Sequence, residues 1–132
     1  MRFTSFQLHI GCNIFKALSE ESRLRIMFLM YTNGKMCISD IEHILDFTQS
    51  KTSRHISYLK NCGLLSTTKK DQWVYYFIKE EFMGIISQTL SFMEKDVIVT
   101  KDQKTYDTLY SNNILAIRKL HNEQKRYKLR EL

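Results

Sequence analysis

One stretch of the chain combines side chains that can contact an anion with a complete absence of acids. Residues 47–65, FTQSKTSRHISYLKNCGLL, contain no Asp or Glu, whereas an exposed helix usually mixes both signs of charge. Glutamine can pair bidentately with adenine, arginine and lysine suit guanine or phosphate, and serine reaches base edges or phosphates. The candidate contact residues are Thr48, Gln49, Ser50, Lys51, Ser53, Arg54 and His55. The stretch therefore predicts a surface for a negatively charged partner, for which double-stranded DNA is the candidate.

The same stretch predicts the helix that would present these groups. Thr48 is a good N-cap and Gly63 a good helix stop. The expected apolar face consists of Thr52, Ile56, Leu59 and Cys62. Exposed N–H groups at the start of such a helix also attract phosphate. For His55 two interpretations remain, a hydrogen bond inside the motif or a position near a phosphate.

Three cysteines are a second set of reactive groups, and an odd number does not form a self-contained disulfide framework. A reducing cytoplasm therefore fits best. The favoured interpretation is that Cys12, Cys37 and Cys62 are small buried hydrophobic residues. The alternatives are a thiol or disulfide sensor and a metal or metalloid site. His9 and Cys12 are three apart on one helix face, and Cys37 could complete a ligand set across the fold or from a partner subunit.

The charge of the chain is +6, which is compatible with an anionic partner, and it is unevenly distributed. Residues 101–132 hold 8 Lys or Arg against 4 Asp or Glu. The run KRYKLR near the end fits a solvated helix face, a contact with the flanks of a DNA site, or, more remotely, an amphipathic membrane helix. The sequence contains no run of 18 apolar residues and therefore predicts no membrane span. No Cys/His/acid trio or glycine-rich phosphate loop indicates an enzyme.

Hydrophobic periodicity and capping residues predict a mainly helical chain with one β-hairpin. The expected helices are residues 4–18, 19–34, 39–46, 49–61, 80–96 and 106–127; an extended piece is expected at 35–38, strands at 64–70 and 73–79, and a break at 96–104. Ser19 is the expected N-cap of the second helix, and Asn33-Gly34 its end. Ser39 and Glu42 are expected to open the third helix as a capping box.

Apolar residues at helical spacing predict which faces are buried. In the first helix they are Phe6, Ile10, Ile14 and Leu18; after the hairpin they are Phe82, Ile85, Ile86, Thr89, Phe92 and Met93; in the last helix they are Leu109, Tyr110, Ile114, Ile117 and Leu120. The middle of the second helix is apolar nearly all round, which predicts the central helix of the core.

The order helix, helix, short strand, helix, helix, hairpin, helix is that of a winged helix-turn-helix, a mainly α fold with a small β-hairpin wing (α+β). Lys69 and Lys70 at the tip of the hairpin would lie along a DNA backbone or minor groove. We expect residues 1–96 to form the DNA-binding and dimerisation domain and residues 97–132 a basic helical extension.

Several motifs resemble the ArsR/SmtB family of bacterial winged-helix repressors. They are FKALSEESRLRIMFLM, the segment CISDIEHILDFTQSKTSRHISYLKNCGLL and the hairpin after it, and together they cover about residues 12–95. The resemblance implies a homodimer built by the first and post-wing helices, and a repressor whose two recognition helices read an inverted repeat. The alternative is a protein-interaction module that kept the fold without operator binding.

The metal sites known in that family are not intact in this sequence. In KMCISDI, Cys37 matches the first cysteine of a C-x-C pair, but Ser39 replaces the second, and serine is a poor ligand for soft metals. The post-wing segment 80–96 contains no histidine or cysteine. We therefore predict no cofactor, with Cys37, Cys12 and His9 as weak metal candidates.

Overall fold

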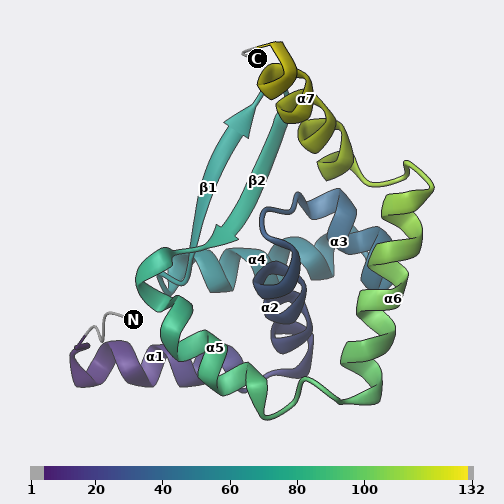
Figure 1. Cartoon of the computed structure of the whole chain (residues 1–132). Helices are drawn as coiled ribbons and strands as arrows, with labels where there is room; N and C mark the ends of the chain where they lie inside the picture. Colours follow the sequence, from purple (N-terminus) through teal and green to yellow (C-terminus); the bar gives the residue numbers. More distant parts are fainter. Residues whose placement is uncertain (1–4, 131–132) are drawn as a thin grey trace.

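The computed structural model describes residues 5–130, which contain seven α-helices, one 3-10 turn and a two-stranded antiparallel sheet (Figure 1). In chain order the elements are α1 (Leu8–Leu18), α2 (Glu21–Asn33), α3 (Ile38–Leu45), α4 (Gln49–Asn61), β1 (Leu65–Lys70), β2 (Trp73–Ile78), η1 (Glu80–Phe82), α5 (Met83–Ser91), α6 (Val97–Ser111) and α7 (Ala116–Arg130). The predicted fold class, a mainly helical winged helix-turn-helix, is confirmed.

Helix α2 forms the centre of the molecule, with the other helices arranged around it (Figure 1). The side chains of Ile26, Met27 and Leu29 are almost completely buried, as expected for a helix that is apolar nearly all round. The predicted stripe of the first helix also packs into this core, and its members are Phe6, Ile10, Ile14 and Leu18.

The prediction that Ser19 caps α2 is wrong. Glu20 occupies the N-cap position, and its carboxylate accepts a hydrogen bond from the backbone N–H of Arg23 at 3.0 Å. Ser19 instead ends α1, where its hydroxyl donates to the carbonyl of Lys16 at 2.8 Å. A carboxylate at this position also interacts favourably with the helix dipole, which a hydroxyl does not. The predicted end of α2 is confirmed, because Gly34 closes it with a φ of 84°.

The capping box predicted from Ser39 to Glu42 is also wrong. Helix α3 begins one residue earlier, at Ile38, and Cys37 at its N-cap position makes no side-chain capping bond. Ser39 therefore lies inside the first turn, where its hydroxyl oxygen is 3.2 Å from the sulfur of Cys37. The next residue, Asp40, points into the protein and is 1% exposed.

A tight turn joins α3 to α4, as predicted. Asp46 ends α3 in the left-handed conformation, with a φ of 56°. The hydroxyl of Thr48 caps α4 by accepting the backbone N–H of Lys51 at 3.2 Å. The hydroxyl of Thr52 donates to the carbonyl of Thr48 at 2.9 Å, so the start of α4 is fixed by its own side chains. Gly63, with a φ of 90°, turns the chain into the wing.

The wing is the predicted hairpin, and it is anchored to the segment before α3. Met36 donates its N–H to the carbonyl of Tyr76 at 3.0 Å and accepts the N–H of Tyr76 at 2.8 Å, which ties the extended piece to β2. At the free end of the hairpin, Lys70 pairs with Trp73, and Asp71 in the turn has a φ of 55°. The hairpin projects away from α1 and α5 as a narrow arm, and α7 lies beside its tip (Figure 1).

The helix after the wing is shorter than predicted, since α5 ends at Ser91. Phe82 and Ile86 are buried, as expected, and so is Leu90. The prediction that Phe92 belongs to the buried stripe is wrong, because its side chain lies beyond the end of the helix and is 90% exposed.

The predicted break at residues 96–104 is wrong, because α6 runs from Val97 to Ser111. Four β-branched residues at its start disfavour a helix. The carboxylate of Asp96 nevertheless caps the helix by accepting the backbone N–H groups of Ile98 at 2.8 Å and Val99 at 3.3 Å. Capping and tertiary packing therefore override the local preference.

The single last helix predicted at 106–127 is also wrong, since the chain leaves α6 and enters a separate α7. Asn113 makes the break with a φ of 60°. Leu115 is buried just after it, whereas Ile114, which was expected on the buried side, is 49% exposed. Ile117 and Leu120 are buried as predicted.

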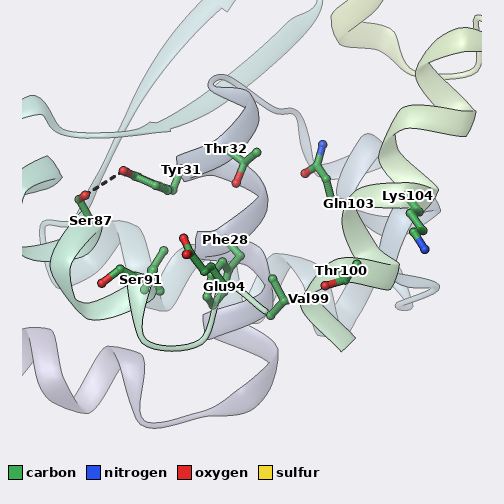
Figure 2. A pocket seen from close by; sticks show the side chains of 11 residues that line it. Phe28, Tyr31, Thr32, Ser87, Ser91, Glu94, Val99, Thr100, Gln103 and Lys104 are labelled. Atoms are coloured by element: carbon green, nitrogen blue, oxygen red, sulfur yellow. Dashed lines mark hydrogen bonds between the residues drawn. The ribbon is translucent and has the colours of Figure 1, made fainter. Parts of the chain in front are cut away.

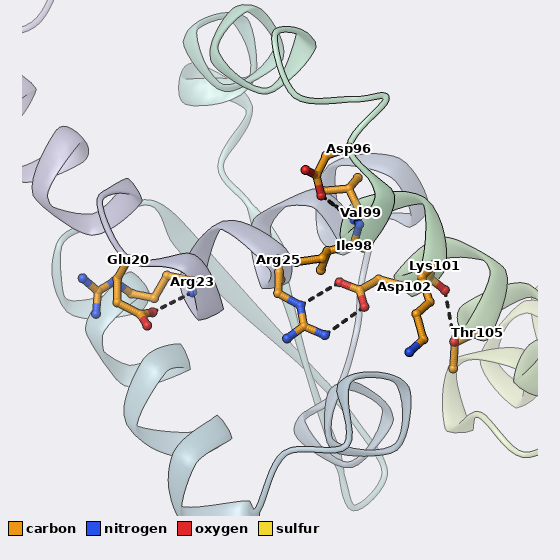
Figure 3. A network of polar contacts seen from close by, with 9 residues as sticks. All are labelled: Glu20, Arg23, Arg25, Asp96, Ile98, Val99, Lys101, Asp102 and Thr105. Carbon is orange, nitrogen blue, oxygen red and sulfur yellow. Dashed lines mark hydrogen bonds and ion pairs between the residues drawn. The ribbon is translucent and has the colours of Figure 1, made fainter.

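The C-terminal helices are attached to the core by polar contacts as well as by apolar packing. The guanidinium of Arg25 on α2 forms a bidentate ion pair with Asp102 on α6, with both N–O distances at 2.9 Å (Figure 3). The amides of Asn33 and Gln103 exchange two hydrogen bonds at 2.8 and 2.9 Å. Such paired contacts fix the rotation of α6 about its own axis against α2.

Helix α7 is attached through its N-terminus. The buried carboxylate of Asp40 on α3 accepts the backbone N–H groups of Ala116 at 2.8 Å and Ile117 at 3.0 Å. These N–H groups have no partner inside their own helix, so an acid from a distant part of the chain satisfies them. The first helix of the helix-turn-helix is thereby joined directly to the extension.

A groove of about 420 Å³ lies between α2, α5 and α6 (Figure 2). Phe28 and Leu90 contribute apolar surface to it, and Tyr31 on α2 donates a hydrogen bond to Ser87 on α5 at 2.8 Å across one side.

Within residues 5–130, no helix is both long enough and apolar enough to cross a membrane.

Candidate nucleic-acid interface

Helix α4 has an inner face that holds it on the domain and an outer face that faces solvent. Thr52, Ile56 and Leu59 are buried against the rest of the helix-turn-helix, as the sequence predicts. The polar residues predicted to contact DNA are exposed or half-buried, with the exception of His55: they are Thr48, Gln49, Ser50, Lys51, Ser53 and Arg54. The N-terminal half of α4 therefore presents amides, hydroxyls and cations together.

Charge on this outer face is unopposed by nearby acids. Lys51 lies over the ring of Phe47, with its Nζ 4.0 Å from the ring centre, which holds the ammonium beside the turn without neutralising it. Within residues 5–130, neither Lys51 nor Arg54 forms an ion pair with a carboxylate. Both cations are therefore available to an anion that approaches the start of α4.

His55 lies on the inner side of α4 and is buried. Its Nδ1 is 3.7 Å from a carboxylate oxygen of Glu20 and has no hydrogen-bond partner among the described residues. Burial lowers the pKa of His55, and the nearby carboxylate offsets only part of that effect. The position favours a role inside the motif, where the ring packs α4 against the start of α2, over a direct contact with DNA.

The wing brings a second pair of cations to the surface. Lys69 and Lys70 are exposed at its tip, next to the single acid of the turn, Asp71. Lys70 also pairs with Glu123 on α7, with 3.2 Å between Nζ and Oε2. No local pattern predicts this contact, because it joins residues more than fifty positions apart and depends on a break between α6 and α7 that was not predicted.

Two further residues extend the surface of α4 beyond the predicted set. Tyr58 is exposed near the C-terminal half of the helix, and the guanidinium of Arg23 on α2 lies 4.1 Å from the centre of its ring. Arg23 also donates to the carbonyl of Ala17 at 2.7 Å, which fixes its stem. The regular spacing of Ser50, Arg54 and Tyr58, four apart on one face, was a sequence signal that could have included the tyrosine.

The cysteine and histidine candidates are not assembled into a metal site. Cys37 is buried and its pKa is raised by burial, which disfavours the thiolate that binds metals. Cys12 and His9 are exposed on α1, and Cys62 is half-buried and donates to the carbonyl of Leu59 at 3.2 Å. Within the described residues, no three His, Cys, Asp or Glu side chains come close enough to hold a metal ion.

A helix-turn-helix with a projecting wing, whose recognition helix presents unpaired cations and hydrogen-bonding groups, defines a winged-helix DNA-binding protein. Residues 20–67 match the sequence profile of the bacterial regulatory proteins of the arsR family. The chain is 34% identical over 85 residues to the arsenic resistance transcriptional regulator ArsR1 of Pseudomonas putida, covering 64% of this chain and 63% of the relative, which is less than two thirds of its length.

Similarity to a second relative extends over more of that protein's length. The arsenical resistance operon repressor of Bacillus subtilis is 39% identical over 77 residues, which are 58% of this chain and 73% of the relative. The solved structure of HlyU from Vibrio cholerae has a TM-score of 0.58 at 26% identity and covers 64% of this chain and 91% of that one. The chain belongs to the arsR family of bacterial regulatory proteins.

Proposed function

We propose that the protein is a homodimeric, sequence-specific transcriptional repressor of the ArsR type that acts in the cytoplasm on an inverted-repeat operator. The observation that carries the proposal is the outer face of α4, where exposed amide, hydroxyl and guanidinium groups stand without an opposing acid. Its inner face is packed against the domain, so the outer face cannot be needed for the core. A groove of duplex DNA supplies both the negative charge and the base edges that these groups match.

Within this proposal the side chains divide into two roles. Gln49 and Arg54 read base edges, the first suited to adenine and the second to guanine. Ser50, Lys51 and Ser53 position the helix on phosphates, with help from the exposed first turn of α4. Lys69 and Lys70 on the wing contact the backbone beside the site.

We propose the dimer because a single subunit exposes large apolar side chains to water. Leu8 and Phe15 on α1 are 86% and 61% exposed, and Phe92 after α5 is 90% exposed. Helices α1 and α5 both lie at the end of the molecule opposite the wing tip (Figure 1). Burial of such side chains against a second copy is favourable by about 25 cal/mol per Å². If the two recognition helices of the dimer enter successive major grooves on one side of the duplex, the half-sites lie about 34 Å apart, one turn of DNA.

In vitro selection from a randomised duplex library tests the proposal. The expected result is an enriched inverted repeat that binds two subunits, as measured by gel shift and analytical ultracentrifugation at moderate salt. A duplex with one half-site scrambled should bind more weakly than the complete repeat. If no sequence is enriched and the chain binds all duplexes alike, the repressor proposal is abandoned in favour of a protein-interaction module.

A further inference from the structure

We propose that α7 is a second DNA-binding element, which works beside the wing and contacts phosphates that flank the operator. The inference deepens the proposed function and rests on it. It assigns a role to the basic end of the chain, which neither the fold of the helix-turn-helix nor the recognition helix explains.

The first observation is that α7 has a fixed place on the domain. The carboxylate of Asp40 caps its N-terminus, and Leu115, Ile117 and Leu120 bury its first half in the core. Helix α6, which leads to it, is held by the bidentate ion pair of Arg25 (Figure 3). The cations of α7 are therefore presented at a defined position and are not distributed along a flexible tail.

The second observation is that this place is next to the tip of the wing. In Figure 1 the yellow end of α7 lies beside the ends of β1 and β2. The 3.2 Å pair between Lys70 and Glu123 joins the two elements, and an open groove between them is lined by Lys70, Gln124, Tyr127 and Lys128. A duplex that reaches the wing therefore also reaches α7.

The third observation is the charge that α7 adds there. The part of the helix from Asn122 to Arg130 is exposed on all sides. The helix carries one acid, Glu123, which is already paired with a lysine of the wing. The exposed cations of α7 are Lys119, Lys125, Arg126, Lys128 and Arg130. These cations surround the exposed half of α7, and together with Lys69 and Lys70 they make this end of the molecule basic; we term this group of residues the wing–α7 surface.

Duplex DNA fits this surface better than a membrane does. The apolar side chains in the first half of α7 are buried against the core. The exposed second half carries two large apolar side chains, Tyr127 and Leu129. A membrane-surface helix needs a continuous apolar face along its length. The wing–α7 surface instead continues the surface already proposed to contact a DNA backbone.

The test compares two triple variants of the full chain that remove equal charge. One is Lys125→Gln/Arg126→Gln/Lys128→Gln on α7; the matched control is Lys95→Gln/Lys101→Gln/Lys104→Gln, whose exposed lysines lie before or on α6. Affinity for the selected inverted repeat and for a random 40-base-pair duplex is measured by fluorescence anisotropy across a salt series. The logarithm of the binding constant falls as the logarithm of the salt concentration rises, and each lost phosphate contact makes this slope less steep by about 0.9.

The α7 variant should lose about 10- to 100-fold in affinity for both duplexes and about 2 to 3 in salt slope, while the control stays within about 3-fold of the original chain. If both variants behave alike, the inference is wrong and the repressor proposal stands. Binding to vesicles of phosphatidylglycerol that only the α7 variant loses, with DNA binding intact, would also overturn it. If the unaltered chain binds no DNA, the proposed function itself fails.

A gain of affinity provides a second measurement that misfolding cannot imitate. Glu123→Gln removes the acid of α7 and releases Lys70 from its pair. The expected result is tighter binding to both duplexes, by about 2- to 5-fold at low salt, because one phosphate-repelling charge is lost. Unchanged or weaker binding of this variant, with the fold intact by circular dichroism, contradicts the inference.

Discussion

At the scale of single residues, polar side chains that are neighbours in α4 differ in whether they face solvent or the interior. Arg54 and His55 are neighbours in the sequence and both were predicted to contact DNA, yet one faces solvent and the other faces Glu20. The sequence identified the polar set and its N-cap, Thr48, because local spacing determines both. It could not assign His55 to the inner face, since that depends on how α4 is rotated against α2.

Arg54→Ala is expected to weaken binding to the selected operator by about 1–3 kcal/mol, because a bidentate contact to a base edge is lost. Binding to random duplex should change much less. Both affinities are measured by gel shift at one salt concentration. An equal loss on the two duplexes would assign Arg54 to a phosphate instead of a base.

The buried ring of His55 predicts a loss of stability on acidification. Its pKa in the folded protein lies below the ordinary value of about 6.5, so the neutral form is favoured by folding. The stability linked to it is complete above that ordinary value and is lost as the pH falls through the folded pKa. His121, whose pKa is also lowered by burial, contributes in the same direction.

Melting temperatures at pH 7.5 and 5.5 test this linkage. Between pH 7.5 and 5.5, the melting temperature of the His55→Gln variant should fall less than that of the unaltered chain. His43→Gln is the control, because that side chain is exposed. An equal drop for the unaltered chain and His55→Gln would show that His55 does not carry the pH dependence.

At the scale of elements, the order of helices and strands in the first two thirds of the chain was predictable, whereas the division of the last third into α6 and α7 was not. The turn between α3 and α4 and the two strands of the hairpin follow from local signals, such as Thr48 and Gly63. Helix α6 was missed because the four β-branched residues at its start favour extended structure, while the contacts that stabilise it come from α2. The start of α7 depends on Asp40, 76 residues away from Ala116.

Asp40→Ala is expected to destabilise the protein by about 1–3 kcal/mol, because two N–H groups of α7 lose their buried acceptor. Asp40→Asn, which keeps one acceptor oxygen, should lie between. Urea denaturation measures the stability, and hydrogen exchange at Ala116 and Ile117 reports whether the helix start opens. Asp46→Asn is the control, since this exposed residue has a left-handed conformation that asparagine tolerates. Equal stability of the Asp40 and Asp46 variants would rule out the capping role.

At the scale of the whole molecule, two ends carry different tasks. The end formed by α1 and α5 exposes large apolar side chains, and the opposite end carries the wing and α7 (Figure 1). The boundary that we predict at residue 96 separates the family-like domain from the extension. The extension nonetheless contacts the domain at three places on α2 and α3, through Arg25, Asn33 and Asp40.

The double variant Phe15→Ser/Phe92→Ser is expected to raise the dissociation constant of the dimer by at least about 100-fold, since each side chain would contribute at least about 1.5 kcal/mol when buried. Sedimentation equilibrium measures the constant. Leu129→Ser on α7, which removes another strongly exposed apolar side chain at the other end, is the control. A double variant that dimerises like the control would locate the interface elsewhere.

The register of the hairpin also supplies an optical probe. Trp73 is the single tryptophan of the chain, and it lies directly across from Lys70 at the wing tip. Its emission spectrum therefore comes from the one part of the molecule where the wing, α7 and a bound duplex would meet. A titration followed at 295 nm excitation (a wavelength at which tyrosine absorbs little) would track occupancy of that corner in the unlabelled, unmodified protein.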